Sequence, residues 1–265
     1  ALHPRDRRQR QMCIRDSYVI DELKRNDLPI ELAFLPFIES SYDPFSISSS
    51  GAVGLWQIMP KTAELLGLRE NWWIEERHDP YKSTDAAIRY IDYLYKRFNK
   101  DIYLALVAYN AGPTFTSKAI QRNIRRTSDF SYKDLPLSAQ TRNYIPKFLA
   151  LIELINNNEK YNIDLPEIPY SKVVDKISFE EQIEILNFSD FLNLKPELLY
   201  KLNAGYTKWA TDPNMVSTFY IPIESKINYE RNGQEYIQSQ KINWISHDVS
   251  RGCLLYTSPS PRDVP

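Results

Sequence analysis

The sequence predicts a mainly α-helical protein, with a small mixed α/β segment toward its C-terminal side. Apolar residues recur at three- and four-residue steps through most of the first 156 residues, which is the spacing of amphipathic helices. Helix-starting Pro, Ser and Asp residues precede these runs, and Gly67 and Gly112 follow two of them. Short runs typical of strands occur only beyond residue 170. The chain is therefore expected to be a helical domain followed by a smaller module.

Both ends of the chain look foreign to the rest. Residues 7–16 read RRQRQMCIRD and residues 253–263 read CLLYTSPSPRD, and both back-translate to the sequence of a transposase sequencing adapter. We therefore set residues 1–16 and 251–265 aside as translated adapter before reasoning about the fold. Cys13 and Cys253 are the two cysteines of the chain, and both lie in these ends. The remainder is expected to contain neither a disulfide nor a thiol nucleophile.

Composition and charge exclude several classes of function. The chain has a formal net charge of −1, and its two ends hold seven arginines and three aspartates, which leaves about −5 for the remainder. An acidic remainder argues against a nucleic-acid partner. His3, His78 and His247 are scattered without the spacing of metal ligands, and no Gly-rich phosphate loop is present, so no metal or other cofactor is predicted. No apolar run approaches the ~20 residues that a membrane-spanning helix needs.

The first helix is predicted from a proline and an apolar face. Pro29 suits the first turn of a helix, and the apolar residues that follow it share one face. Pro36 lies inside this run, so a kink or a break is expected there. Glu39 then falls close to the end of the helix, next to a loop.

Five further helices of the first domain follow by the same reasoning. Ser83 or Thr84 is expected to cap a long amphipathic helix that runs to Phe98. The other expected helices of the first domain are Pro60–Leu66, Asp101–Tyr109, Pro113–Asn123 and Ser138–Asn156, the last interrupted by Pro146.

A polar, proline-punctuated linker is predicted over residues 157–170, and a strand, helix, helix, strand unit over residues 171–225. Its expected elements are the strand Lys172–Ser178, the helices Phe179–Asn187 and Lys195–Asn203, and the strand Ser217–Ile223. Residues 226–250 are expected to be a further linker or the start of another region. A plainer alternative is that residues 171–225 form a small extension packed on the first domain.

Three short segments in fixed order carry the functional information: FIESS around Glu39, GLWQIMP at Gly54–Pro60, and AYNAGP at Ala108–Pro113. They belong to five longer segments that together span residues 28–155, about half of the chain: LPIELAFLPFIESSYDP (28–44), SSGAVGLWQIMP (49–60), RHDPYKSTDAAIRYIDYL (77–94), ALVAYNAGP (105–113) and TRNYIPKFLALIELI (141–155). This pattern resembles the lytic transglycosylases with a lysozyme-like SLT domain, of the glycoside hydrolase family 23 type. The resemblance implies a lysozyme-like helical catalytic domain over residues 17–156.

Glu39 is the candidate catalytic residue. Cleaving a glycosidic bond requires a proton for the departing oxygen, and a glutamic acid supplies it near neutral pH only when an apolar setting raises its pKa. Phe34, Leu35, Phe37 and Ile38 precede Glu39 and could form that setting. Most glycosidases use a second carboxylate. Asp43 lies four residues on, but Asp-Pro after a helix is typical of a turn.

The resemblance implies that one carboxylate suffices. In this family a single Glu protonates the MurNAc–GlcNAc β-1,4 bond and then deprotonates the C6 hydroxyl of the same sugar, which leaves a 1,6-anhydro-MurNAc end without consuming water. Such enzymes act in cell-wall remodelling or turnover. Two alternatives stay open: a lysozyme-type muramidase on the same fold, and a peptidoglycan-binding protein without activity.

The family pattern also assigns candidate substrate-binding residues. Gly51 and Gly54 would let the backbone approach the sugar closely. Trp56 could either stack on a pyranose ring or fill the core, and Tyr109 could contact the glycan or Glu39 or pack in the core. Gln140 stands where the family pattern has Glu, which puts the role of that position in doubt. The expected substrate-binding residues are Ser48, Ser50, Trp56, Gln57, Tyr109, Asn110 and Tyr144.

The unit at residues 171–225 looks like a degenerate LysM-type peptidoglycan-binding module, although the Gly-Asp pair that opens such modules is absent. The resemblance implies peptidoglycan glycan strands as the partner. It also implies a place in the cell envelope, in the periplasm or at the inner face of the outer membrane, with membrane association through an N-terminal signal or lipid anchor beyond the given sequence.

Overall fold

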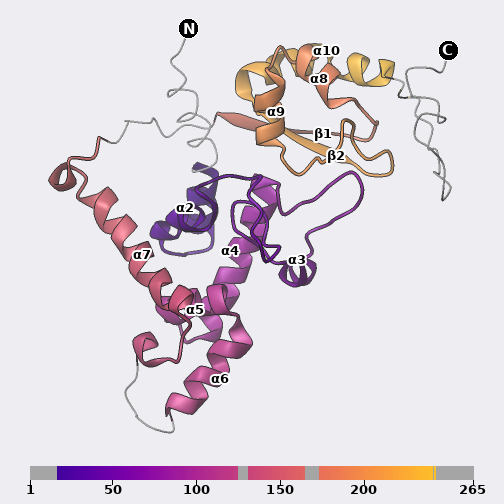
Figure 1. The fold of residues 1–265 in the computed structure, drawn as a ribbon. Helices are drawn as coiled ribbons and strands as arrows, with labels where there is room; N and C mark the ends of the chain where they lie inside the picture. Colours follow the sequence, from indigo (N-terminus) through magenta and orange to yellow (C-terminus); the bar gives the residue numbers. More distant parts are fainter. Residues whose placement is uncertain (1–16, 125–130, 165–172, 241, 243–265) are drawn as a thin grey trace, which may run out of the picture.

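The computed structural model describes residues 17–124, 131–164, 173–240 and 242 (Figure 1). The fold is mainly helical, as predicted, and one two-stranded sheet lies in its C-terminal part. The two ends that we interpret as adapter, residues 1–16 and 251–265, lie outside the described residues. Among the described residues no helix combines the length and the apolar character that crossing a membrane requires.

The described part of the chain begins with a helix at residues 17–25. The next helix, predicted to start at Pro29, is divided near Pro36, as expected. The 3₁₀-helix η1 (Ile30–Phe34) ends directly before α2 (Leu35–Ser40), and Pro36 lies in the first turn of α2. Proline is tolerated there because the first-turn N–H groups have no partner within the helix. The 3₁₀-helix and α2 together place Glu39 at the penultimate position of α2.

The helices α3 (Pro60–Leu66) and α4 (Pro80–Arg97) follow. Gly67 ends α3 with φ of 75°, as predicted. The predicted start of α4 was wrong: its cap is Asp79, whose side chain accepts hydrogen bonds from the backbone N–H groups of Tyr81 and Lys82. Ser83 and Thr84 lie buried within the helix, where their hydroxyls bond to carbonyls one turn back.

The central helix is α5 (Ile102–Ala111), which Asp101 caps. Residues 104–108 are all buried, so the helix is apolar around its whole circumference and lies within the core. It contacts α4, α6 (Pro113–Ile124) and α7 (Ala139–Asn156). Short 3₁₀ turns that the sequence did not predict flank α7: η2 (Tyr132–Asp134) and η3 (Glu159–Tyr161).

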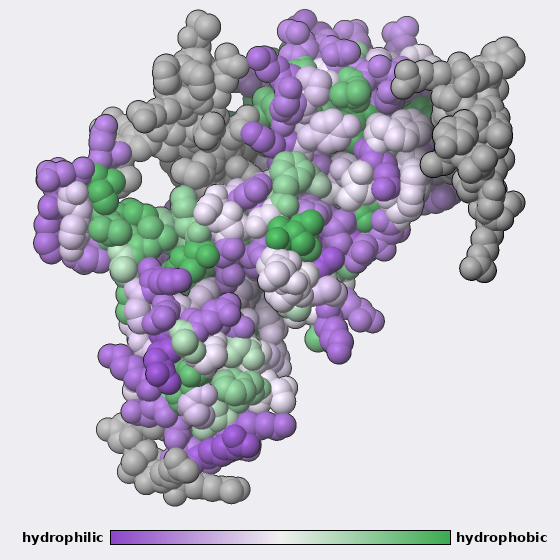
Figure 2. Space-filling view, in the orientation of Figure 1, coloured by the Kyte–Doolittle hydropathy of each residue, from purple (hydrophilic) through white to green (hydrophobic). Residues whose placement is uncertain are grey.

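Helix α7 was expected to be interrupted at Pro146, but it is continuous through that residue. Pro146 lies on the exposed face, so the carbonyl that loses its helical N–H partner can bond to solvent instead. On the opposite face Tyr144, Ile145 and Phe148 are buried in the core, and this packing holds the helix on both sides of the proline. Apolar side chains gather over α7 in the view of Figure 2.

The C-terminal part has the order strand, helix, helix, strand, helix. Strand β1 (Val174–Phe179) pairs antiparallel with β2 (Ser217–Pro222), with Ile177 opposite Phe219. The helix expected from Phe179 begins later, because Phe179 still belongs to the strand and buries its ring against Phe219. The remaining elements are α8 (Ile185–Phe191), α9 (Pro196–Leu202) and α10 (Ile223–Ser239), the last over residues for which no element was predicted.

This C-terminal part packs directly on the helical part. A β-bridge joins Ile74 to Tyr206, and the backbone N–H of Glu75 donates to the carbonyl of Gly205 over 2.8 Å. The rings of Tyr81 and Tyr220 stack with centroids 3.4 Å apart.

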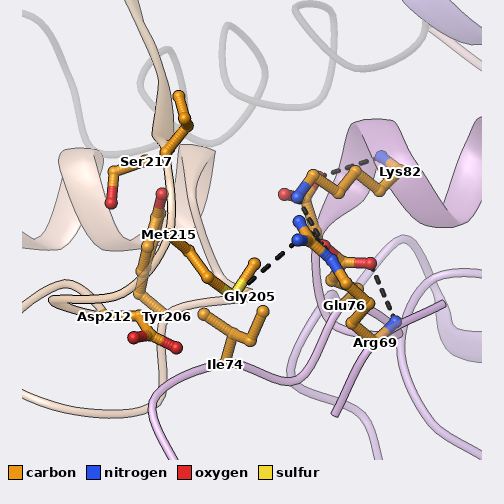
Figure 3. A pocket seen from close by; sticks show the side chains of 11 residues that line it. Arg69, Ile74, Glu76, Lys82, Gly205, Tyr206, Asp212, Met215 and Ser217 are labelled. Carbon is orange, nitrogen blue, oxygen red and sulfur yellow. Dashed lines mark hydrogen bonds and ion pairs between the residues drawn. The ribbon is translucent and has the colours of Figure 1, made fainter. Parts of the chain in front are cut away.

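A cavity of about 20 Å³ lies at the same junction, between an ion-paired group and residues of the C-terminal part (Figure 3). Arg69, Glu76 and Lys82 form that group, and Glu76 bonds to both of the basic side chains. The cavity is too small for a sugar ring, so the junction is a packing interface at this point.

Candidate active site

The candidate catalytic carboxylate is held at a rigid helix end. Glu39 is followed by Ser40, whose hydroxyl donates to the carbonyl of Leu55 over 2.9 Å and so ties α2 to the loop at residues 46–58. Ser41 then leaves the helix in the left-handed conformation, with φ of 54°. The chain reverses direction directly after Glu39. The Glu39 side chain is half-buried at the edge of the helical core.

Burial raises the pKa of Glu39 to about 7, from an ordinary value of 4.5. One hydrogen bond opposes this shift: the hydroxyl of Tyr144, on α7, donates to Oε1 of Glu39 over 2.5 Å. Burial and the neighbouring Glu39 raise the pKa of Tyr144 well above its ordinary value of 10, so Tyr144 remains a proton donor in this bond. Glu39 can therefore exist in both protonation states near neutral pH.

Tyr109 completes the surroundings of the carboxylate. Its hydroxyl donates to the backbone carbonyl of Trp56 over 2.7 Å, which connects α5 with the loop at residues 46–58. Burial, and after it the charge of Glu39, raises the pKa of Tyr109 well above its ordinary value. The structure thus brings Glu39, Tyr109 and Tyr144 together from α2, α5 and α7, although they are up to 105 positions apart in the sequence.

Trp56 does not present its ring to a ligand, and the expectation that it stacks on a sugar is corrected. Its side chain has no exposed surface, and its Nε1 donates to the hydroxyl of Thr84 over 2.9 Å. The indole therefore belongs to the core beneath the site. Its backbone carbonyl is the group that reaches the site, through the bond to Tyr109.

Asn110 is adjacent to Tyr109 and joins α5 to the start of α7. Its Oδ1 accepts a hydrogen bond from the hydroxyl of Thr141 over 2.8 Å, and the Thr141 backbone N–H bonds in turn to the cap residue Ser138. The neighbouring Gln140, which departs from the family pattern, has an exposed side chain. The retained threonine, and not position 140, makes the link to Asn110.

The other candidate residues lie in the loop at residues 46–58. Ser48 accepts a hydrogen bond from the backbone N–H of Ala52 over 2.9 Å, and its hydroxyl lies 3.0 Å from that of Ser50. Gln57 has φ of 47°, and its side-chain amide donates to the carbonyl of Gly54 over 2.9 Å. Two β-bridges, which pair Val53 with residues 47 and 58, hold the loop. These contacts fix the loop and do not themselves join it to the Glu39 carboxylate.

Arg77 and His78, which the sequence analysis did not name as site residues, support this loop; we call them the buttress. The guanidinium of Arg77 forms a buried ion pair with Glu75, with Nη2 2.7 Å from a carboxylate oxygen, and Nη1 donates to the carbonyl of Gly51 over 3.2 Å. Nδ1 of His78 lies 2.6 Å from the carbonyl of Pro44. The Arg-His-Asp-Pro run at residues 77–80 shows two charged residues in the sequence, but nothing in the run indicates that the fold buries them.

Gly54 is needed where the loop meets this buttress. A Cβ at Gly54 would lie 1.9 Å from the carbonyl oxygen of Arg77, and its φ is 79°. Gly51 has a similar φ of 85°, but open space surrounds its missing Cβ. The close backbone approach expected at Gly54 is therefore made to Arg77.

We expect Gly54→Ala to lower the free energy of unfolding by about 3 kcal/mol, because the added methyl group both strains the backbone and overlaps a carbonyl. Gly51→Ala is the matched control. Backbone strain alone should lower its free energy of unfolding by about 1 kcal/mol. Urea denaturation of both variants measures the difference. Equal losses in the two variants would contradict the packing role of Gly54.

A second carboxylate is not arranged for catalysis in the part of the chain that the structure describes. Oδ1 of Asp43 accepts a hydrogen bond from the backbone N–H of Phe45 over 3.0 Å, which is the turn that Asp-Pro predicted. Burial and Tyr144 account for the shifted pKa of Glu39, without a contribution from another described carboxylate. No group of three or more potential metal ligands occurs among the described residues either. The chemistry of the site centres on Glu39.

Tyr144→Phe should raise the pKa of Glu39 further, by about one unit, because it removes the hydrogen bond that favours the charged carboxylate. NMR titration of the Glu39 side-chain carboxyl carbon measures this shift without reference to activity. Tyr103→Phe removes a hydroxyl from a half-exposed tyrosine on α5 and is the control. An unchanged pKa in Tyr144→Phe would show that burial alone sets the titration.

Comparison with known proteins shows which proteins the chain is similar to. Residues 18–130 match the family described as "Transglycosylase SLT domain". Membrane-bound lytic murein transglycosylase D of Escherichia coli K12 is 32% identical over 188 residues, which are 71% of this chain and 42% of that protein. Membrane-bound lytic murein transglycosylase E of Buchnera aphidicola is 35% identical over 98 residues, which are 33% of this chain and 44% of that protein.

Among solved structures, the 70 kDa soluble lytic transglycosylase of Escherichia coli is 26% identical, with a TM-score of 0.41 over 49% of this chain and 22% of that one. The chain spans less than half the length of these relatives. The matched residues 18–130 include Glu39, Tyr109 and the loop between them. The resemblance of this chain to the lytic transglycosylases with an SLT domain, predicted from three short segments, is thereby confirmed.

Proposed function

We propose that this chain is a peptidoglycan lytic transglycosylase, a lyase that cleaves the MurNAc–GlcNAc β-1,4 bond without water and leaves a 1,6-anhydro-MurNAc end. The observation that carries the proposal is the state of Glu39: a single carboxylate whose pKa burial raises to about 7. Such a group can give up a proton and accept one within the same catalytic cycle at neutral pH. The similarity to lytic murein transglycosylases supports the substrate class.

The proposed reaction balances on one carboxyl group. Protonated Glu39 gives its proton to the bridging oxygen as the bond from C1 of MurNAc to that oxygen breaks. The substrate's own N-acetyl group stabilises the positive charge that develops at C1. The Glu39 carboxylate then removes the proton from the C6 hydroxyl of the same MurNAc, and O6 bonds to C1. Glu39 ends the cycle protonated, as it began, and no water is consumed.

The two tyrosines have positioning roles in this proposal. Tyr144 donates to Oε1 of Glu39 and so fixes the carboxyl group. We propose that Oε2 is the oxygen that faces the substrate. Tyr109 is held by its bond to the Trp56 carbonyl and lines the same site. We propose Ser48, Ser50, Gln57 and Asn110 as polar partners of the sugar hydroxyl and acetamide groups, since their amides and hydroxyls both donate and accept.

A muramidase on the same fold is the less supported alternative. Hydrolysis would require a positioned water and, in most glycosidases, a second carboxylate. Asp43 is occupied in a turn. A peptidoglycan-binding protein without activity would not need the buried carboxylate, since burying a carboxyl group disfavours its charged form.

We further propose that residues 17–156 are the catalytic domain, residues 157–170 a linker, and residues 171–225 a degenerate LysM-like module that binds peptidoglycan. The strand, helix, helix, strand order of β1, α8, α9 and β2 supports the last assignment. The proposed location is the cell envelope, in the periplasm or at the inner face of the outer membrane. An N-terminal signal or lipid anchor would provide membrane association.

Product analysis tests this function. Purified peptidoglycan is digested with residues 17–250, and the muropeptides are compared by mass spectrometry with those of a muramidase digest. We expect products lighter by one water at their MurNAc ends. Hydrated reducing ends would assign the chain to the hydrolases, and the absence of any cleavage by the folded protein would overturn the enzymatic proposal.

A further inference from the structure

The helical part and the C-terminal part together form a groove. A groove of about 560 Å³, within the range of ligand-binding clefts, lies between them. We call it the aromatic groove. Phe45 and His78 line it from the helical part, and Tyr200, Tyr206, Lys208 and Trp209 line it from the C-terminal part.

The two walls of the aromatic groove are fixed to each other by backbone contacts. The backbone N–H of Thr207 donates to the carbonyl of Trp73 over 2.9 Å, and its hydroxyl donates to the carbonyl of Trp72 over 3.1 Å. These bonds act together with the bridge between Ile74 and Tyr206. The segment that holds Lys208 and Trp209 is therefore held on the helical part, so the groove exists without a ligand to form it.

Aromatic side chains are presented at both walls. Phe45 is 44% exposed and Trp209 is 41% exposed, so each ring offers part of its surface to a ligand in the groove. Each ring has an aromatic neighbour: the ring of Phe45 lies 6.3 Å from that of His78, and the ring of Trp209 packs edge-on against the buried Trp73 at 6.2 Å. Rings that are exposed and fixed can offer flat apolar surface at little entropic expense.

The charge of the aromatic groove selects among ligands. No Asp or Glu lines it within the described residues, whereas Lys208 and His78 do. The Lys208 ammonium lies 4.8 Å from the centre of the Trp72 ring, at the rim. Flat aromatic faces with a few hydrogen-bond donors and one cation suit a chain of pyranose rings that is neutral or carries carboxylates. They do not suit a cationic ligand.

The groove is also continuous with the candidate active site along the chain. Phe45 follows Glu39 by six positions, in the segment where the chain reverses direction after α2. The side-chain amide of Gln57 donates to the carbonyls of Ser46 and Gly54, so Phe45 is next to a residue that the loop holds. His78 holds the carbonyl of Pro44, next to Phe45.

We propose that the aromatic groove binds a glycan strand at sugars away from the bond to be cleaved, with Phe45 and Trp209 stacking on pyranose rings and Lys208 facing a carboxylate of the strand. The C-terminal part would then contribute directly to substrate binding, as one wall of an extended site. This inference rests on the proposed function for the identity of the strand. It assigns a binding role to Lys208 and Trp209, which lie outside the segment that matches the SLT domain family, and to Phe45, which lies within it.

Titration calorimetry with the β-1,4-linked hexamer of N-acetylglucosamine tests the groove. All measurements use the Glu39→Gln background, so that the probe stays intact and binding is read independently of catalysis. We expect Phe45→Ala and Trp209→Ala each to raise Kd about tenfold. Phe115→Ala is the matched control, because Phe115 is 43% exposed on α6 and does not line the groove. Its Kd should match that of the background.

The outcomes separate this inference from the proposed function. Unchanged Kd values in both groove variants, with melting curves that show intact folds, would overturn the aromatic groove as a glycan site, whatever products the wild-type protein makes. The proposal would also be overturned if Phe45→Ala and Trp209→Ala weakened the binding of isolated stem peptides but left the Kd of the hexamer unchanged. Conversely, failure of the wild-type protein to make anhydro ends would leave the Kd comparison intact as a test of the groove.

Discussion

Glu39→Gln is expected to lower kcat/KM on peptidoglycan by about 10²–10⁴-fold, the usual contribution of a positioned general acid or base. The amide retains the size of the carboxyl group and can still accept the hydrogen bond that Tyr144 donates to Oε1. It has no acidic proton for the bridging oxygen and no basic site for the C6 hydroxyl, so both halves of the proposed cycle stop. Release of soluble muropeptides, measured over time, gives the rate.

The matched control is Glu64→Gln, which makes the same chemical change at an exposed position on α3. We expect it to retain full activity. Loss of activity in both variants would point to a general effect of charge. Retention of activity in Glu39→Gln would remove Glu39 from the mechanism.

A stability measurement shows whether Glu39→Gln remains folded. Burial raises the folded-state pKa of Glu39 above its ordinary 4.5, so the carboxyl contributes stability below pH 4.5 that is lost as the pH rises through about 7. At pH 8 the charged carboxylate destabilises the fold, and the neutral amide does not. The variant should therefore unfold at a higher urea concentration than the wild type at pH 8.

The pH dependence of activity is the second large effect. The reaction begins with protonated Glu39, and its pKa of about 7 means that the protonated fraction falls tenfold for each pH unit above that value. We expect kcat/KM to decline with a midpoint near pH 7, since kcat/KM reports the free enzyme. Initial rates from pH 5 to 9 on solubilised glycan strands measure the midpoint.

Tyr144→Phe provides the control for this profile. Its midpoint should move upward together with the pKa of Glu39 from NMR, because both report the same proton. A profile that is flat between pH 6 and 9 would contradict Glu39 as the acid. A midpoint that does not follow the NMR value in Tyr144→Phe would assign the profile to another group.

The helical elements were predictable because their signals are local. Pro36, Gly67, Asp101 and Ser138 each act within one turn of the residue they affect, and the structure confirms the break, the stop and the two helix starts that they predicted. The start of α4 was wrong because several residues could cap it. Asp79, Ser83 and Thr84 all suit a cap, but Ser83 and Thr84 lie within the helix, where their hydroxyls bond to carbonyls one turn back.

Three features depended on tertiary packing that periodicity does not report. Trp56 reads equally well as a sugar platform or a core residue, and its zero exposure follows from what α4 places against it. Pro146 is tolerated because its face of α7 is exposed. Helix α10 has a polar sequence and is held by its packing on the sheet, through residues such as Ile237.

The sequence predicted which residues form the candidate site, but it did not predict how they contact one another. The family resemblance pointed to Glu39, Tyr109 and Tyr144. The side of Glu39 on which Tyr144 lies, and the use of the Trp56 carbonyl in place of its ring, required the packing of α2, α5 and α7. Arg77 was missed because a buried ion pair leaves no periodic signal in the sequence.

The most direct test of the central claim is digestion of peptidoglycan in water enriched in oxygen-18. In the proposed reaction O6 of MurNAc closes on C1 of the same sugar, so no oxygen from the solvent enters the product. We predict muropeptides that are lighter by one water and free of the label in the wild-type digest, and no such products with Glu39→Gln. Incorporation of one labelled oxygen at C1 in the wild-type products would contradict the account, because it would mean that water attacks and that the chain is a hydrolase.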